Sequence, residues 1–156
     1  MMSQISKNLY KKLQKQYSRR INLDLKRIKK VLQKLNNPQE QVDNIINIIG
    51  SDGKNSVLTS LKYFLEANKE KVNTFTSPHL YDVRQRFWLG DRFITINEIK
   101  KYKRLIEKTK VKLTLFELLT CIYVLSAKNT DDSSFNLIES GPVSYTHLTL
   151  PTSVTV

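Results

Sequence analysis

The heptapeptide Gly50-Ser51-Asp52-Gly53-Lys54-Asn55-Ser56 contains residue types that bind phosphate groups. It follows an apolar run, 45–49, and precedes a helical pattern, so it is predicted to turn the chain from a buried strand into a helix. Such a turn directs backbone N–H groups and a helix N-terminus at one point, where Lys54 adds a positive charge. The spacing departs from the Walker pattern G-x-x-x-x-G-K-[ST]. The alternative is that the glycines only turn the chain and Lys54 is solvated.

A second polar segment, Thr76-Ser77-Pro78-His79-Leu80, follows the next predicted strand, and Glu139 ends the third. Because parallel strands end at one edge of a sheet, we expect both to face the same crevice as the glycine-rich turn. A hydroxyl in 76–80 could ligate Mg²⁺, with the Glu139 carboxylate as a second ligand, since Mg²⁺ prefers oxygen. For Glu139 the alternative is an exposed strand end. For His79 alone, a structural hydrogen bond is predicted in preference to metal binding or proton transfer, because it is the commoner role of a lone histidine.

The elements that would hold these residues follow from the hydrophobic pattern, which is helical at first and then mixed. Helices are predicted along the stripe Ile5, Leu9, Leu13, Tyr17, over 24–35, from the glycines through Leu65, and over 97–110 and 115–128. Strands are predicted at 44–49, 72–75 and 135–138, with a hairpin at 87–96 around Gly90-Asp91. The strand–helix–strand order predicts a right-handed parallel unit. The fold class is therefore α/β, a P-loop-type parallel sheet with flanking helices.

Positive charge is concentrated near the start of the chain. The net charge is +12, and residues 7–34 carry eleven Lys or Arg against the single acid Asp24, a net of +10. A basic helical surface could bind nucleic acid, an anionic membrane or a small anion. The simpler interpretation is a solvated face, because Leu25, Ile28, Leu32 and Leu35 recur at helical spacing and leave only the opposite face charged.

Length and composition exclude several classes. The 156 residues fit one domain or part of one, with no apolar run long enough to cross a bilayer. The first ten residues lack the apolar region of a signal peptide, which favours a cytoplasmic protein. Cys121 lies in the apolar stretch 118–125, so we expect a core residue rather than a nucleophile or ligand, and no disulfide within the chain.

Several motifs occur in an order that resembles one enzyme family. They are Tyr10 onward, Arg27-Ile28, Gly50 to Ser56, Thr76-Ser77-Pro78-His79-Leu80, Arg84-Gln85-Arg86, Phe116-Glu117 and Ile138-Glu139-Ser140-Gly141. Together they look like folylpolyglutamate synthase/dihydrofolate synthase, of the Mur ligase superfamily. The match runs from about Tyr10 to Gly141, and the family's chain is more than twice as long. We therefore expect residues 1–141 to be the N-terminal part of the ATP-binding domain, inactive alone.

The resemblance implies ATP-dependent addition of L-glutamate to a folate or dihydropteroate carboxylate through an acyl phosphate. It implies ATP and Mg²⁺ as cofactors, a monomeric intact enzyme, and neither nucleic-acid nor membrane partners. Gly50 to Ser56 would bind the nucleotide, with Lys54 stabilising phosphate, and Ser77 and Glu139 would bind Mg²⁺. The pterin would contact two segments, with Phe116 packing on the ring and Glu117 accepting its N–H bonds; the segments are Arg20, Ile21, Asn22, Leu23 and Thr114, Leu115, Phe116, Glu117. Without the family, a core Phe and a solvated Glu are the alternative.

Three residues depart from the family's pattern. Asp52 replaces an Asn and places a negative charge beside the phosphates, Asn55 replaces a Gly, and Gln85 replaces a Glu often found between two arginines. Asn tolerates left-handed backbone better than most residues, so the loop shape can survive at Asn55. Two alternative functions stay open: a basic nucleic-acid-binding module, and another Mur-type ATP-dependent acid–amino-acid ligase.

Residues 142–156 do not fit the family. After Gly141 the family continues with a glycine-rich turn, whereas this chain continues with Pro142 and then the segment 143–152. Back-translated, that segment matches the end of a transposon-type sequencing adapter. We therefore expect 142–156 to be a non-biological tail, unstructured or forming an adventitious strand, and we assign His147 no catalytic role.

Overall fold

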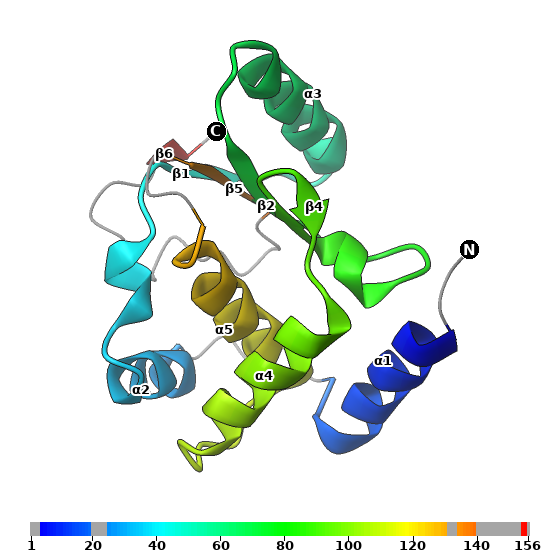
Figure 1. The fold of residues 1–156 in the computed structure, drawn as a ribbon, viewed down its shortest axis with the longest axis vertical. Coiled ribbons are helices and arrows are strands. Elements are labelled where there is room, and N and C mark those ends of the chain that lie inside the picture. The colour runs from blue at the N-terminus through cyan, green and yellow to red at the C-terminus, as the bar shows by residue number, and fades with distance from the viewer. Residues whose placement is uncertain (1–3, 20–24, 131–133, 140–153, 156) are drawn as a thin grey trace.

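The computed structural model describes residues 4–19, 25–130, 134–139 and 154–155 (Figure 1). The helices are α1 Gln4–Gln16, α2 Lys26–Lys34, α3 Lys54–Ala67, α4 Ile96–Glu107 and α5 Leu115–Ala127, with short 3-10 helices η1 Pro38–Gln41 and η2 Val83–Arg86. The strands are β1 Ile45–Ile48, β2 Val72–Phe75, β3 Phe87–Leu89, β4 Arg92–Phe93, β5 Phe135–Glu139 and β6 Val154–Thr155. Each helix and strand predicted before residue 140 is confirmed, with small differences at the ends.

One sheet joins the strands in the order β4-β3-β2-β5-β1-β6. β5 pairs in parallel with both β1 and β2, so it lies between the two strands that precede the predicted binding loops. β3 pairs antiparallel with β2 and with β4, which confirms the hairpin. The predicted α/β fold with a mainly parallel sheet is confirmed. The carboxyl ends of β1, β5 and β2 therefore lie side by side.

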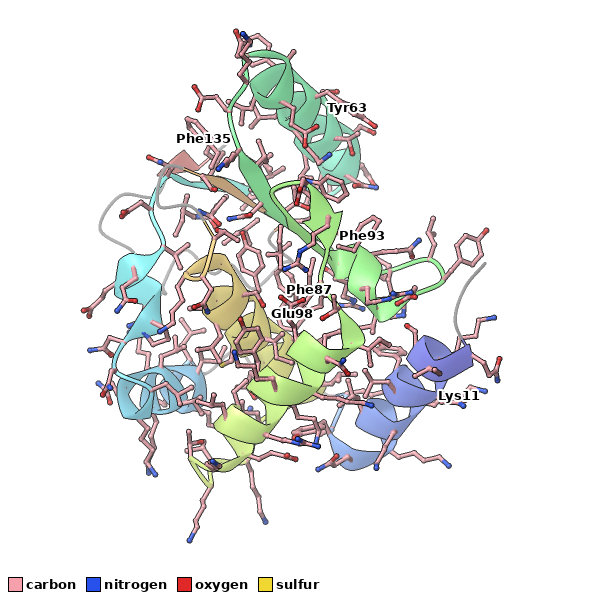
Figure 2. All side chains as sticks on the ribbon, in the orientation of Figure 1. Lys11, Tyr63, Phe87, Phe93, Glu98 and Phe135 are labelled. Carbon is pink, nitrogen blue, oxygen red and sulfur yellow. The ribbon has the colours of Figure 1, made fainter. Side chains whose placement is uncertain are left out.

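The two faces of the sheet carry cores of different size. Nearly all of α5 is buried, and its Tyr123 stacks on Phe75 with ring centroids 5.1 Å apart. Figure 1 shows α2, α4 and α5 on this side of the sheet and α3 on the other. Under α3 the buried cluster of described residues is smaller, with partly buried side chains packed against it; its buried members are Ile48, Leu58, Val72 and Leu137. The main core thus lies under α5, where Figure 2 shows Phe87 in the interior, while Tyr63 lies on the outer surface of α3.

Two predictions about side chains can be judged directly. Cys121 is fully buried, and burial raises the pKa of its thiol, so the prediction of a core residue is confirmed. On α2, Ile28 and Leu32 are buried while Lys29 and Lys30 are exposed, as expected for a helix with one solvated basic face. No helix among the described residues has the length and apolar character that crossing a membrane requires.

Hydrogen bonds near both ends of α1 hold this helix against the rest of the protein. At its start the buried Ser6 hydroxyl donates to Asp82, just before η2. At its end Gln16 and Tyr17 donate to the Glu107 carboxylate of α4, at 2.8 and 3.0 Å. The helix therefore spans from the loop after β2 to the end of α4.

The predicted tail lies mostly outside the described residues. Residues 140–153 and 156 belong to that part, and Val154–Thr155 forms β6 beside β1 at the edge of the sheet. The expectation of a non-biological tail stays a prediction.

Candidate functional site

The glycine-rich turn connects β1 to α3, as predicted. Gly53 has φ 74° and precedes the first residue of α3, in the left-handed region where glycine is favoured. Lys54 Nζ donates to the backbone carbonyls of Gly50 and Ser51, at 2.8 and 3.1 Å, so the lysine lies across the turn. Asn55 lies within α3, so no left-handed backbone is required at that position. The change from the family's glycine to Asn55 is therefore compatible with the shape of the turn.

The N-terminus of α3 is left open. No side chain of the described residues caps it, and its first turn carries no acidic residue. α4 and α5 instead begin with complete capping boxes, formed by Thr95 with Glu98 and by Thr114 with Glu117. A helix start has N–H groups without intrahelical partners, and in the part of the chain that the structure describes no capping side chain accepts from them at α3. Such a start fits a phosphate group in charge and in hydrogen bonding.

The two predicted metal ligands lie together. The backbone N–H of Ser77 donates to Glu139 Oε2 at 2.9 Å, joining the loop after β2 to the end of β5. Glu139 is only 7% exposed, so the alternative of an exposed strand end is wrong. The hydroxyl and the carboxylate supply the hard oxygen donors that Mg²⁺ prefers. Among the described residues no group of three or more His, Cys, Asp or Glu could hold a metal.

His79 has a structural partner. Its Nδ1 accepts a hydrogen bond from Arg86 Nε at 2.9 Å, and Tyr10 of α1 contacts the imidazole edge-on with centroids 4.3 Å apart. Burial and the nearby Arg86 charge lower the pKa of His79. The prediction of a structural hydrogen bond is confirmed.

The loop that carries Ser77 is closed by the cap of η2. Gln85 Oε1 accepts from the backbone N–H groups of Tyr81 and Asp82, at 3.0 and 3.1 Å. An amide oxygen can accept both bonds as a carboxylate would, so Gln85 retains this structural role without the charge of Glu. Burial alone would raise the pKa of Asp82, but hydrogen bonds from Arg84 and Ser6 outweigh burial and lower it to about 2.

The two segments predicted to contact a pterin can be placed only in part. Arg20, Ile21, Asn22 and Leu23 lie outside the described residues. Thr114, Leu115, Phe116 and Glu117 form the cap and first turn of α5, where Phe116 is half-buried and the others are buried. The Leu115 N–H donates to the Ser18 carbonyl at 2.9 Å, and Arg27 donates to Glu117. The residues on both sides of 20–23 therefore contact the start of α5.

Sequence reasoning missed three contacts in this region: Ser6 with Asp82, Tyr10 with His79, and Arg27 with Glu117. The partners are far apart in the chain, and no local pattern connects them. The spacing of Thr114 and Glu117 did carry a signal, because Thr-x-x-Glu before an apolar run is a capping-box pattern.

The fold is α/β with polar loops at the carboxyl ends of adjacent parallel strands, and comparison with known proteins shows which proteins it resembles. A search of models of protein families finds no match. The chain is 34% identical over 105 residues to the dihydrofolate synthetase of Saccharomyces cerevisiae, an alignment that covers 65% of this chain and 24% of the yeast protein. The chain thus spans about a quarter of that relative.

The fold also resembles solved structures of folylpolyglutamate synthases. The folylpolyglutamate synthase of Mycobacterium tuberculosis complexed with ADP superposes with a TM-score of 0.75 and 24% identity, over 88% of this chain and 32% of that one. The bifunctional folylpolyglutamate synthase/dihydrofolate synthase of Yersinia pestis, complexed with AMPPNP and Mn ion, gives 0.74 and 23%, over 90% and 35%. The resemblance to the folylpolyglutamate synthase/dihydrofolate synthase family is thereby confirmed in sequence and in fold.

Proposed function

We propose that this chain is part of an ATP-dependent ligase that joins L-glutamate to the carboxylate of a folate or a dihydropteroate. One observation carries the proposal: the glycine-rich turn, Ser77 and Glu139 follow or end three adjacent strands, β1, β2 and β5, in a fold shared with folylpolyglutamate synthases. Ligands of such sheets bind at the carboxyl ends of the strands. Because the chain spans only part of its relatives, the activity of the whole protein is a proposal.

ATP is the proposed nucleotide, in keeping with ADP and AMPPNP in the two related structures. The open start of α3 would bind phosphate oxygens through its N–H groups, and Lys54 would neutralise part of their charge. The lysine would exchange its bonds to the Gly50 and Ser51 carbonyls for the phosphate, which is a stronger acceptor. Asp52 is exposed, so water screens its unfavourable charge.

Mg²⁺ is the proposed metal, and Mn is present in the Yersinia pestis structure. The Ser77 hydroxyl and the Glu139 carboxylate would hold it, and the Ser77 N–H already fixes one oxygen of that carboxylate. Bound there, the metal would neutralise charge on the transferring phosphoryl group. In the proposed reaction the acceptor carboxylate takes the γ-phosphoryl group, and the glutamate amine then attacks the acyl phosphate and releases inorganic phosphate. The residues contribute position and charge.

A pterin acceptor is proposed for the region around the start of α5. Support comes from the contacts of Ser18 and Arg27 with Leu115 and Glu117, which bring residues flanking 20–23 to the turn that carries Phe116. The names of the relatives favour folate-type acceptors over those of other Mur-type ligases. The monomeric state, the absence of nucleic-acid partners and the cytoplasmic location stay predictions.

Nucleotide binding by the chain tests the site directly. We expect AMPPNP with Mg²⁺ to bind in calorimetry, and Lys54→Ala to weaken it about tenfold or more through loss of a charge-assisted bond. Glu139→Gln should weaken binding only when Mg²⁺ is present. Lys100→Ala, an exposed lysine of α4, is the matched control and should leave affinity unchanged. Equal affinity in all four proteins would reject the assignment of the turn.

Turnover by the product of the complete gene tests the reaction. We expect ADP release that depends on L-glutamate and on either dihydropteroate or folate, and the two acceptors separate the two activities. No glutamate-dependent release with either acceptor would reject the ligase function.

A further inference from the structure

The carboxylate of Glu117, in the first turn of α5, already accepts hydrogen bonds from groups of the protein. Glu117 Oε1 accepts from both Nε and Nη2 of Arg27, at 3.1 and 3.0 Å, and Oε2 accepts from the backbone N–H of Thr114 at 2.6 Å. A carboxylate oxygen accepts about two hydrogen bonds, so Oε1 is fully used. Only 3% of the Glu117 side chain is exposed. Glu117 is therefore turned toward Arg27 and its own helix cap.

Arg27 and Ser18 both contact the first turn of α5. The Ser18 carbonyl accepts from the Leu115 N–H, and Arg27 reaches Glu117 two residues further along the same turn. Ser18, in the segment after α1, and Arg27, in α2, thus contact the same helical turn. A guanidinium is suited to this contact, because its planar fork presents Nε and Nη2 together, and an ammonium cannot reproduce that geometry.

We propose that Arg27 and Glu117 are positioning residues of the acceptor site, an inference that rests on the proposed function. The ion pair fixes the first turn of α5 against residues 18 and 27, and Glu117 makes no direct contact with the pterin. This differs from the role predicted from the sequence, in which Glu117 accepts N–H bonds from the ring. In this proposal the acceptor contacts the first turn of α5, and the ion pair between Arg27 and Glu117 maintains the conformation of that turn.

A double-mutant cycle separates positioning from direct contact. Arg27→Lys, Glu117→Gln and the double variant are compared with wild type for binding of dihydropteroate and folate in titration calorimetry, and AMPPNP affinity is measured as an internal reference. We expect each single variant to weaken acceptor binding about tenfold and the double variant to be no weaker than the worse single one, because both changes break the same pair. AMPPNP affinity should stay within about twofold of wild type in all three.

Hydrogen exchange at the Leu115 amide reports on the pair without any ligand. Because this N–H donates to Ser18, its exchange should rise about tenfold in Arg27→Lys and in Glu117→Gln, without a further rise in the double variant. Lys30→Gln removes a charge from the exposed face of the same helix and should change neither readout. Arg27→Lys retains the positive charge and most of the aliphatic stem, so it is expected to fold.

Two results would overturn the proposal. One is weaker acceptor binding in Glu117→Gln while Arg27→Lys binds as wild type does, which indicates direct contact. The other is unchanged Leu115 exchange in Arg27→Lys. Failure of the proposed function gives a different result: wild type binds neither acceptor, while the coupled rise in Leu115 exchange still supports positioning of the turn by the pair.

Discussion

The starts of α3 and α5 are built in opposite ways, although both lie near the proposed site. α3 begins after Gly53 with no side-chain cap, and α5 begins with the Thr114–Glu117 capping box, reinforced by Arg27. An uncapped start leaves N–H groups for a ligand, whereas a capped start satisfies them within the protein. The open start therefore suits direct phosphate binding, and the closed start suits a rigid support for a neighbouring substrate.

The helices also differ in how they are held on the sheet. α5 is buried on nearly all sides, while α3 exposes Val57, Tyr63 and Phe64. A helix buried all round cannot shift without opening the core. A helix on a small core keeps local freedom, as regions that bind ligands commonly do. Stability is thus concentrated on the α5 side.

The largest expected effect tests that asymmetry. Leu118→Ala in α5 should lower the free energy of unfolding by about 4 kcal/mol, and Leu58→Ala in α3 by about 2.5 kcal/mol, because the more open side relaxes around a cavity more easily. Both leucines are buried, at 0% and 2% exposure, so burial alone does not explain the difference. Urea unfolding of the two variants measures it. Equal losses would contradict the asymmetry.

Acid should weaken the capped starts of η2 and α4. The pKa of Asp82 in the cap of η2 falls from 3.8 to about 2, and that of Glu98 in the cap of α4 falls from 4.5 to about 2. A carboxyl whose pKa is lowered by folding stabilises the protein above its unfolded pKa and loses this contribution as pH falls through the folded value. For Asp82 the loss is about 2 kcal/mol between pH 4 and pH 2.

Asp82→Asn provides the comparison, since asparagine has the same shape and does not titrate. Urea unfolding at pH 6 and at pH 2 should show a stability difference between the two proteins that shrinks toward acid. A difference that stays constant with pH would mean that Asp82 contributes by shape alone. α3 has no acid in its first turn, so its start contributes no such dependence.

A smaller effect is expected from the cap of α5 itself. Thr114→Ala removes the hydroxyl that accepts from the Glu117 N–H at 3.3 Å, and should cost about 1 kcal/mol. Thr114→Ser retains an oxygen there and should recover most of the loss. Thermal unfolding of both variants measures this. A loss retained in Thr114→Ser would assign the effect to packing of the methyl group.

Local sequence predicted the elements well and the contacts between them poorly. The apolar run of β1 and the helical spacing of Leu58, Leu61 and Leu65 are determined by nearest neighbours, so they could be read directly. The position of β5 between β1 and β2 depends on contacts between residues far apart in the chain. This position brings Glu139 against Ser77. Arg27 and Glu117 are 90 residues apart, so no periodicity connects them. The predicted roles of the site residues came from the resemblance, and their positions required the fold.

The smallest expected effect on stability is at Lys54, where the proposed effect on binding is large. Its Nζ bonds to two carbonyls in an exposed turn, and water can replace it at both. Lys54→Ala should therefore change the free energy of unfolding by no more than about 0.5 kcal/mol, as surface substitutions usually do. Urea unfolding without nucleotide checks this against wild type. A loss of about 2 kcal/mol or more would mean that the two bonds of the lysine to the Gly50 and Ser51 carbonyls hold the turn together.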